Sequence, residues 1–456
     1  MQEKQEERLG SEPIGKLIVS MAVPSVAAQI INVLYNIIDR VYIGHIEGYG
    51  DMALTGAEVT FPILMLISAF SAFAGMGGAP LAPIRMGRQE YDEAEDILGN
   101  SAGLLVLFAV MLTIVFSIFK TPILYAFGAS ENSITYAVDY ISVYLLGTIF
   151  VQIAVGLNTF ISGQGQAKIA MLSVLIGAVL NILLDPVFIF VLHMGVRGAA
   201  LATIISQAVS ALWILHFLTS QKSVIRLRLR KMRLKPSLVG KIASLGISPF
   251  IMQSTESLVS ITLNSGLQRY GGDLYVGTMS ILSSVMQLIV IPMQGVSQGV
   301  QPIISYNYGA KNGKRVKEAF FKMLAICFLG TFLLAGIAVI APEIYAGIFT
   351  SNQALVNLTC EVMPVYFLGI TMFGIQNACQ STFLALGQAK VSLFIALLRK
   401  VILLIPLAII LPKFMGVMGI YRAEPIADVI SVLITILLLT VTFKKILHNM
   451  ENRDMI

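Results

Sequence analysis

Acidic and amide side chains recur at helical spacing inside apolar stretches of this sequence. Asn181 and Asp185 are four residues apart, and Asp39 ends a polar face that also holds Tyr35 and Asn36. Residues three or four apart lie on the same side of a helix. Ionisable groups inside apolar spans are costly and are therefore functional candidates.

Further oxygen ligands lie beside these residues. Pro186 has no N–H to bond the carbonyl of Ile182, which leaves that carbonyl free to face a ligand. Ala199 and Thr203, four residues apart, share a face of the next apolar stretch. Two carboxylates with amide, hydroxyl and carbonyl oxygens are typical of a site for a hard cation or a proton.

A simpler interpretation remains open for both carboxylates. Asp39 is followed by Arg40 and would merely pair with it, while Asp185 would cap a local turn. This interpretation explains Asp185 poorly, because no basic residue lies near it in its own stretch.

The elements that must position these residues are membrane-spanning helices. Of the 456 residues, 56% are hydrophobic and 12% are charged, whereas soluble chains carry about 25% charged residues. The apolar residues run in long blocks instead of alternating, which favours helices over a β-barrel. About 20 apolar residues cross a bilayer. Twelve predicted spans lie near 15–43, 53–79, 97–119, 134–162, 169–192, 198–219, 240–267, 276–304, 319–341, 357–385, 391–412 and 419–443.

Basic residues indicate the orientation of the spans. Eight of the 31 basic residues fall between 220 and 241, with no acid among them, which predicts a cytoplasmic loop. An RNA-binding or lipid-headgroup-binding patch is the less favoured alternative. The charged N-terminal segment lacks the apolar core of a cleavable signal peptide. With an even number of spans, both termini are expected in the cytoplasm of a multi-pass protein of the inner (plasma) membrane.

The sequence also contains an internal repeat. The tetrapeptide GQAK at 165–168 recurs at 387–390, and Gly77 and Pro80 recur as Gly299 and Pro302, at an offset of 222 in both cases. Each repeat holds six spans, so the two lobes are expected to be related by a pseudo-two-fold axis along the membrane normal. The predicted division is an N-lobe at 1–219, a basic connector at 220–239 and a C-lobe at 240–456. Such an all-α polytopic membrane protein has the architecture of a secondary transporter.

Several longer motifs carry a resemblance to a known family. They are PIGKLIVSMAVPSV and LYNIIDRVYIG within 13–44, GQGQAK and NILLDPVFIF within 163–190, GVRGAALAT at 195–203 and GVQPIISYNYGA at 299–310. Over essentially its whole length the sequence resembles multidrug and toxic compound extrusion (MATE) transporters of the bacterial drug-efflux type. The resemblance implies an antiporter that exports amphipathic and cationic drugs in exchange for H⁺ or Na⁺ by alternating access.

The resemblance also implies which residues bind the ions and the drugs. By position, the N-lobe cation site falls on Asp39, Asn181, Asp185, Ala199 through its backbone carbonyl, and Thr203. A dehydrated carboxylate favours its protonated form, while one with more oxygen neighbours holds Na⁺, so these residues suit either ion. The candidate substrate contacts are Tyr35, Asn36, Gln152, Asn158, Glu256 and Gln287.

The second half does not repeat the two carboxylates. At the repeat offsets, Asp39 corresponds to Asn264 and Asp185 to Leu407. Glu424 and Asp428 share a face of the last span, and the favoured interpretation is a structural charge network with basic neighbours. The candidates for those neighbours are Arg422, Arg399 and Lys400.

Other functions and partners fit the sequence less well. The main alternative is a flippase of the same superfamily for lipid-linked oligosaccharides, although the cavity-facing charges here are mainly acidic. No enzymatic activity is expected, because a prenyltransferase would need a second acidic cluster besides Asn181 and Asp185. The expected partners are small amphipathic or cationic molecules and the lipid bilayer, with no nucleic acid. A monomer is expected, with no cofactor besides the coupling ion.

Overall fold

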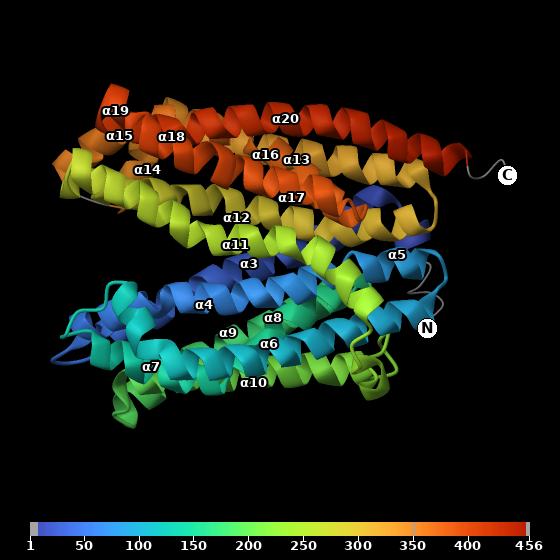
Figure 1. The fold of residues 1–456 in the computed structure, drawn as a ribbon, viewed down its shortest axis with the longest axis horizontal. Helices are drawn as coiled ribbons and strands as arrows, with labels where there is room; N and C mark the ends of the chain where they lie inside the picture. Colours follow the sequence, from blue (N-terminus) through green and yellow to red (C-terminus); the bar gives the residue numbers. More distant parts are fainter. Residues whose placement is uncertain (1–7, 350–351, 453–456) are drawn as a thin grey trace. The chain divides into compact units, whose positions relative to one another are not determined.

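In the computed structural model, residues 8–349 and 352–452 are described, and the regular structure among them is helical throughout (Figure 1). The chain folds into two compact units. Unit 1 comprises residues 1–11 and 27–253, and unit 2 comprises residues 12–26 and 254–456.

Unit 1 contains the helices of the first half of the chain. Helix α8 packs against α4, α6, α9 and α10, and it therefore lies at the centre of the unit. The elements are α2 (Arg8–Ser11), the second part of α3 (Ile14–Gly44), α4 (Gly50–Gly78), α5 (Leu81–Gly87), α6 (Tyr91–Ala126), α7 (Ile134–Leu146), α8 (Thr148–Gly163), α9 (Ala167–Pro186), η1 (Val187–Val191), α10 (Gly195–Thr219), η2 (Leu229–Met232) and the first part of α11 (Pro236–Tyr270).

Unit 2 contains the helices of the second half. Helix α13 packs against α12, α15 and α16, and α20 packs against α15 and α16. The elements are the first part of α3, the second part of α11, α12 (Asp273–Gly309), α13 (Gly313–Ile340), α14 (Pro342–Phe349), α15 (Gln353–Ile370), α16 (Phe373–Ala385), α17 (Ala389–Leu397), η3 (Leu398–Leu404), α18 (Ile405–Ile410), α19 (Pro412–Met415) and α20 (Val417–Asn452).

Two helices are shared between the units. The first part of α3, up to Val26, belongs to unit 2, and the first part of α11, up to Gln253, belongs to unit 1. Each helix has an internal proline close to the residue where its assignment changes from one unit to the other. These prolines are Pro24 in α3 and Pro249 in α11. The packing units differ from the predicted lobes in two segments. Residues 12–26 pack in unit 2, although they belong to the predicted N-lobe, and residues 220–253 pack in unit 1, although they belong to the predicted connector and C-lobe. The division of the sequence by repeats stays a prediction.

Glycines allow the two shared helices to pack closely against their neighbours. A Cβ atom on Gly299 of α12 would lie 2.6 Å from the Cα of Ala22 in α3. In unit 1, a Cβ atom on Gly77 of α4 would lie 2.9 Å from the Cα of Gly246 in α11. Gly77 and Gly299 occupy equivalent positions in the two repeats. In each unit, therefore, a repeat-related glycine allows a shared helix to pack closely.

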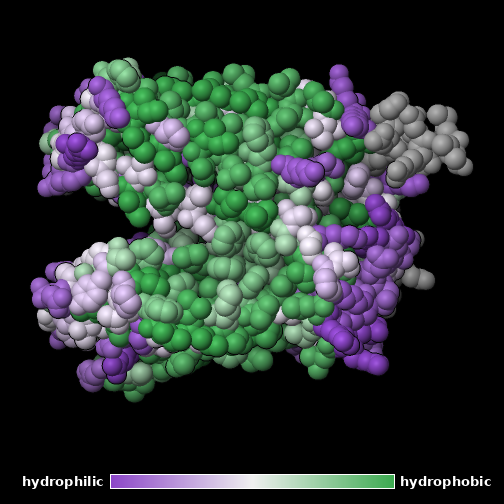
Figure 2. Space-filling view, in the orientation of Figure 1, coloured by the Kyte–Doolittle hydropathy of each residue, from purple (hydrophilic) through white to green (hydrophobic). Residues whose placement is uncertain are grey.

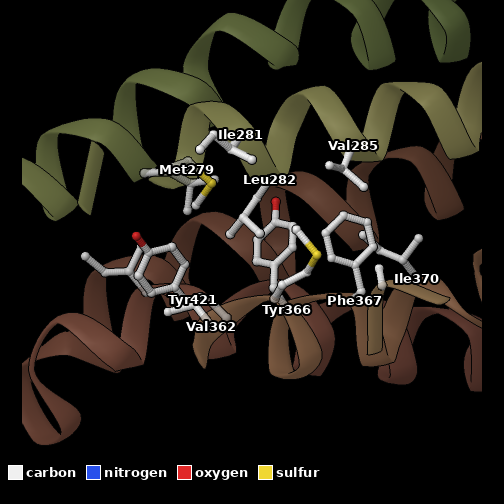
Figure 3. Packing of buried hydrophobic residues seen from close by; sticks show 14 of the residues in the cluster. Met279, Ile281, Leu282, Val285, Val362, Tyr366, Phe367, Ile370 and Tyr421 are labelled. Carbon is white, nitrogen blue, oxygen red and sulfur yellow. The ribbon is translucent and has the colours of Figure 1, made fainter. Parts of the chain in front are cut away.

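The core of unit 2 is a cluster of aromatic and aliphatic side chains from α12, α15 and α20. Figure 3 shows Tyr366 of α15 beside Leu282 of α12, with Tyr421 of α20 on one side of it and Phe367 on the other. The rings of Tyr366 and Phe367 meet edge to face, with centroids 5.5 Å apart. The Tyr421 hydroxyl donates a hydrogen bond to the Tyr275 carbonyl at 2.7 Å, which satisfies its only polar group.

The exposed surface agrees with membrane-spanning helices. On the face in Figure 2, hydrophobic residues cover the middle of the helices in each unit and hydrophilic residues gather at their ends. Ten helices or continuous helix pairs of the described residues are long and apolar enough to cross a membrane. An eleventh is the pair α7 and α8, bent by 61°.

The predicted spans agree closely with the helices. One of these helices, α11, is more polar than a membrane-crossing helix is expected to be. The predicted span 240–267 forms part of the 35-residue helix α11, which is not among the candidates for crossing a membrane. Polar residues interrupt its apolar sequence, among them Gln253, Glu256, Ser260 and Asn264. These four positions follow helical spacing and lie on one side of α11. Such a side is too polar to face lipid.

The basic connector is bound to the start of α6. Lys231 Nζ lies 2.5 Å from an Asp92 carboxylate oxygen and 3.2 Å from one of Glu95, and Lys235 Nζ lies 2.6 Å from one of Asp96. Burial acts to lower the pKa of Lys231, but the hydrogen bonds to Asp92 and Glu95 outweigh burial and raise it. Lys231 and Lys235 therefore form ion pairs within unit 1.

Candidate functional site

Three helices of unit 1 bring the predicted cation-site residues together. Asp39 lies on the second part of α3, Asn181 and Asp185 on the last turns of α9, and Ala199 and Thr203 on the first turns of α10. Asn181 and Asp185 are buried, and Asp39 is partly buried. The carboxyl groups of Asp39 and Asp185 lie close enough to interact with each other.

Asn181 links α9 to α10. Its Nδ2 atom donates hydrogen bonds to Oδ1 of Asp185 at 3.1 Å and to Oγ1 of Thr203 at 3.4 Å. The Thr203 hydroxyl donates in turn to the Ala199 carbonyl at 3.1 Å. The donors of this network are thus used between its own members, and some of its acceptor oxygens are left without a donor.

Three of those oxygens have no hydrogen-bond partner among the described residues. They are Oδ1 of Asp39, Oδ1 of Asn181 and Oδ2 of Asp185, and all three atoms are buried. Buried polar atoms are normally satisfied, and an orphaned set needs an explanation such as an ion. Oxygen acceptors of this kind suit Na⁺ or a proton, so the donor set fits the predicted ligand.

The simpler interpretation of Asp39 is not supported by its neighbour. Arg40 Nε lies 3.2 Å from a carboxylate oxygen of Glu58 on α4, and its guanidinium lies over the Phe61 ring at 5.4 Å. The proposed turn cap by Asp185 is not supported either. Its Oδ1 accepts from Asn181, and its Oδ2 has no partner among the described residues.

Two tyrosines of α7 border this site, and the sequence reasoning missed them. Tyr140 and Tyr144 are buried with their rings stacked at 6.1 Å, and both lie within electrostatic range of Asp39. Their signal in the sequence is the four-residue spacing of Tyr136, Tyr140 and Tyr144. That spacing places the three hydroxyls on one face of α7.

The predicted substrate contacts of unit 1 differ in accessibility. Tyr35 is partly buried near Asp39, and the exposed Asn36 donates to the Asn32 carbonyl. Gln152 is fully buried and donates to the Ile67 carbonyl at 2.8 Å, which ties α8 to α4.

Asn158, also predicted as a substrate contact in unit 1, serves an interhelical contact. It donates to the Ala170 carbonyl and accepts from the Ser173 hydroxyl, both on α9. Like Gln152, it is therefore engaged between helices. Tyr35 and Asn36 are the two of the four that lie beside the carboxylates.

The two predicted contacts of unit 2 are both exposed. Gln287 lies on α12, and Glu256 lies on α11, where its carboxylate forms an ion pair with Lys400 of η3. Glu256 is thus part of a charged cluster.

Arg399 is the centre of that cluster. Its Nε lies 2.6 Å from Oδ1 of Asp428, its Nη2 lies 2.7 Å from Oε1 of Glu424, and its guanidinium stacks over the Phe373 ring at 4.6 Å. A charge network is present, as the sequence predicts, but Arg422 lies outside it near the Met415 sulfur. Glu424 and Asp428 are buried, so this network is enclosed by protein.

The family model named MatE matches residues 24–187 and 249–410, one segment in each repeat. The chain belongs to the MatE family. The two matched segments begin at Pro24 and Pro249, the prolines of the shared helices. The predicted membership is confirmed.

Curated relatives of this MatE protein span nearly its whole length. It is 24% identical over 437 residues to the multidrug export protein MepA of Staphylococcus aureus strain N315, covering 93% of each chain. It is 23% identical over 418 residues to MepA of Staphylococcus haemolyticus strain JCSC1435, covering 91% of each chain.

Solved structures confirm the fold class of the MatE protein. A MATE crystal structure in the bent conformation matches with a TM-score of 0.91 and 22% identity, over 98% of this chain and 99% of that one. A transporter of the MOP superfamily from Pyrococcus furiosus matches with a TM-score of 0.89 and 22% identity, over 97% and 98% of the chains. The chain is therefore a multi-pass, all-helical membrane protein with the two-lobe, twelve-helix fold.

Proposed function

We propose that this protein is a secondary antiporter that exports amphipathic and cationic drugs in exchange for H⁺ or Na⁺. The observation that carries the proposal is the set of three buried oxygens on Asp39, Asn181 and Asp185, which lack partners among the described residues. Family membership and the curated relatives, which are named multidrug export proteins, support the export of drugs.

In this proposal the coupling ion binds at the Asp39 and Asp185 carboxyl groups. Asn181 holds Asp185 in place through its Nδ2 atom and offers its Oδ1 to the ion. The hydrogen bond between Thr203 and the Ala199 carbonyl fixes the start of α10 beside the ion. A proton or Na⁺ would satisfy the orphaned oxygens and offset the repulsion between the two carboxylates.

We propose that the drug and the coupling ion compete because each favours a different conformation of the protein, and not only because they share a contact. Antiport requires the ion and the drug to prefer different conformations. Asp39 lies on α3, whose first part belongs to the other unit, so an ion bound there acts on a helix common to both units. A change in the packing of α3 around Pro24 is the proposed link. Tyr35 and Asn36 are the proposed drug contacts beside this site, and Glu256 and Gln287 are those of unit 2.

The remaining properties are proposed from the sequence and the family. We infer that both termini lie in the cytoplasm, because the basic connector and the C-terminal tail lie on one side of the predicted spans. The protein is proposed to act as a monomer in the plasma membrane, with neither enzymatic activity nor a nucleic-acid partner.

Ethidium transport in proteoliposomes tests the function. Purified protein is reconstituted, and either a pH gradient or a Na⁺ gradient is imposed while the dye fluorescence is followed. Dye movement driven by one of the gradients is expected and identifies the coupling ion. If neither gradient moves the dye and the protein scrambles labelled lipids, the proposal is overturned in favour of the flippase.

A further inference from the structure

The basic connector at 220–239 keeps two arginines and a leucine exposed, although its lysines are paired with α6. We propose that its 3₁₀ turn η2 binds an anionic phospholipid of the membrane leaflet beside it, with Arg230 and Arg233 on the phosphate and Leu229 among the acyl chains. The inference goes beyond the proposed function, because it concerns the outer surface of unit 1 and neither the ion site nor the drug contacts.

Buried side chains hold the connector in place at both of its ends. The side-chain oxygen of Gln164 accepts from the backbone N–H groups of Val224 and Ile225, at 2.7 Å and 3.2 Å. Further along the chain, Oδ1 of Asn100 on α6 accepts from the N–H of Lys235 at 2.7 Å. The exposed side chains between these points therefore start from a fixed backbone, which lowers the entropic cost of binding a ligand.

The contact with α6 places η2 at the edge of the membrane-crossing part of that helix. The stretch of α6 without charged residues is 97–119, and about 20 residues cross the hydrocarbon of a bilayer. A Cβ atom on Gly99 would lie 2.4 Å from the carbonyl oxygen of Lys231, and one on Gly103 would lie 2.4 Å from that of Met232. The backbone of the connector therefore passes beside the first turns of the charge-free stretch, at the depth of the lipid headgroups.

One side of η2 faces the protein. Side chains three residues apart in a 3₁₀ helix lie in line, and Arg228 and Lys231 share one side of this turn. Arg228 Nε lies 3.1 Å and Lys231 Nζ lies 3.2 Å from the same carboxylate oxygen of Glu95 on α6. The other two sides of the turn are therefore directed away from Glu95.

Of these two outward sides of η2, one is apolar and the other is basic. Leu229 is 85% exposed. Arg230 and Arg233, three residues apart, are exposed and have no ion-pair partner within the part of the chain that the structure describes. A leucine gains free energy on leaving water, and guanidinium groups bind phosphate oxygens in a fixed fork geometry. An apolar residue beside free basic residues is typical of a segment that lies in the membrane interface.

An anionic lipid fits these two sides better than a nucleic acid does. Proteins that bind RNA stack its bases on aromatic side chains, and the segment 220–239 contains no aromatic residue. Leu229 would stay in water beside RNA, whereas the acyl chains below a headgroup remove it from water. Clusters of basic residues next to a membrane-crossing helix are typical of sites for anionic lipids. Of the two partners that the sequence leaves open, the lipid headgroup is therefore the one favoured.

Lipid binding to the purified full-length protein in detergent tests this inference. Native mass spectrometry counts the molecules of dioleoylphosphatidylglycerol, which is anionic, or of dioleoylphosphatidylcholine, which is zwitterionic, that stay bound during a titration. The variant with both Arg230→Gln and Arg233→Gln is expected to bind the anionic lipid more weakly by on the order of ten-fold and the zwitterionic lipid as the wild type does. Leu229→Gln is expected to weaken binding of the anionic lipid several-fold. The matched control carries Lys314→Gln and Lys317→Gln, which remove two exposed charges three residues apart at the start of α13, and should bind as the wild type does.

Four results would overturn the inference, and each of them leaves the proposed drug export intact. The first is an unchanged affinity for dioleoylphosphatidylglycerol in the double-arginine variant, and the second is an equal loss of affinity in the control. The third is an unchanged affinity in Leu229→Gln together with displacement of the lipid by glycerol phosphate, which would indicate a site for free phosphate. The fourth is a double-arginine variant that binds the lipid normally but loses binding of an oligouridine RNA, which would assign the surface to RNA.

Discussion

The carboxyl groups of Asp39 on α3 and Asp185 on α9 lie close enough to interact with each other, although 146 positions separate them in the sequence. Each also keeps one buried oxygen without a partner among the described residues. Two acids in contact hold one proton between them or share a cation. The pair therefore has two states with different charge, which is the property that ion coupling needs.

Removing either acid is predicted to abolish drug export. Asp39→Asn and Asp185→Asn each retain the shape of the side chain but remove one of the two charges that bind the ion. Cells expressing either variant should lose ethidium efflux while the protein still reaches the membrane in normal amounts. Asp139→Asn is the matched control, because Asp139 forms its ion pair with Arg197 at the protein surface. Full efflux in both test variants would disprove the assignment of the ion site.

Close packing of the shared helices predicts sensitivity at the repeat-related glycines. Gly299→Leu would place a side chain where the Cα of Ala22 already lies within 2.6 Å of the Cβ position. Overpacking of this kind costs about 1–3 kcal/mol or more, so the melting temperature in detergent should fall. Gly336→Leu is the control, since no atom of the described residues lies within 4 Å of a Cβ atom there. Equal melting temperatures for the two variants would contradict the packing argument.

The salt bridges of the connector predict a stability effect that does not vary between neutral and mildly alkaline pH. Lys231→Met leaves Asp92, Glu95 and Asp96 without this shared cation. The loss should be about 1.5–3 kcal/mol, the range for hydrogen bonds to charged groups. Thermal unfolding of the two proteins at several pH values measures it.

The direction of the pH dependence is set by the raised pKa of Lys231. A raised pKa in the folded state means that the stabilisation is fully present below the unfolded value of about 10.4 and is lost as the pH rises through the higher folded value. The stability difference between wild type and Lys231→Met should therefore be constant between about pH 6 and about pH 9. A difference that vanishes by about pH 8 would show that Lys231 does not stabilise the connector in this way.

Loss of Arg399 is predicted to destabilise unit 2 more than loss of Arg422. Arg399→Met leaves Glu424 and Asp428 buried without their cation, and breaking a buried pair from one side costs about 3–5 kcal/mol. Arg422→Met, at an exposed position, should stay within about 0.5 kcal/mol of the wild type. Melting temperatures of the purified proteins decide between them, and a larger effect at Arg422 would reject the observed network.

The sequence predicts those parts of the structure that depend on local spacing. Asn181 and Asp185 share a helical face through a four-residue interval and are hydrogen-bonded to each other, and Asn181 also contacts Thr203 on α10. The burial of both Arg399 and Lys400 could not be predicted, because a regular α-helix turns adjacent residues away from each other and the π-helical turn of η3 leaves no clear signal. The structure also shows an exchange of half-helices, in which the first part of α3 belongs to unit 2 and the first part of α11 to unit 1. The repeats could not predict this exchange, because they define where sequences resemble each other and not where chains pack.

That exchange has a consequence for how the chain can be divided. A fragment ending after α10, at Thr219, would lack residues 236–253, which complete the packing of unit 1. It would also carry residues 12–26, whose packing partners lie in the missing fragment. Two fragments made by a cut between α10 and α11 should therefore restore a working protein only when they are synthesised together. The two repeats resemble each other in sequence, but each repeat supplies one helix segment that completes the packing of the other unit.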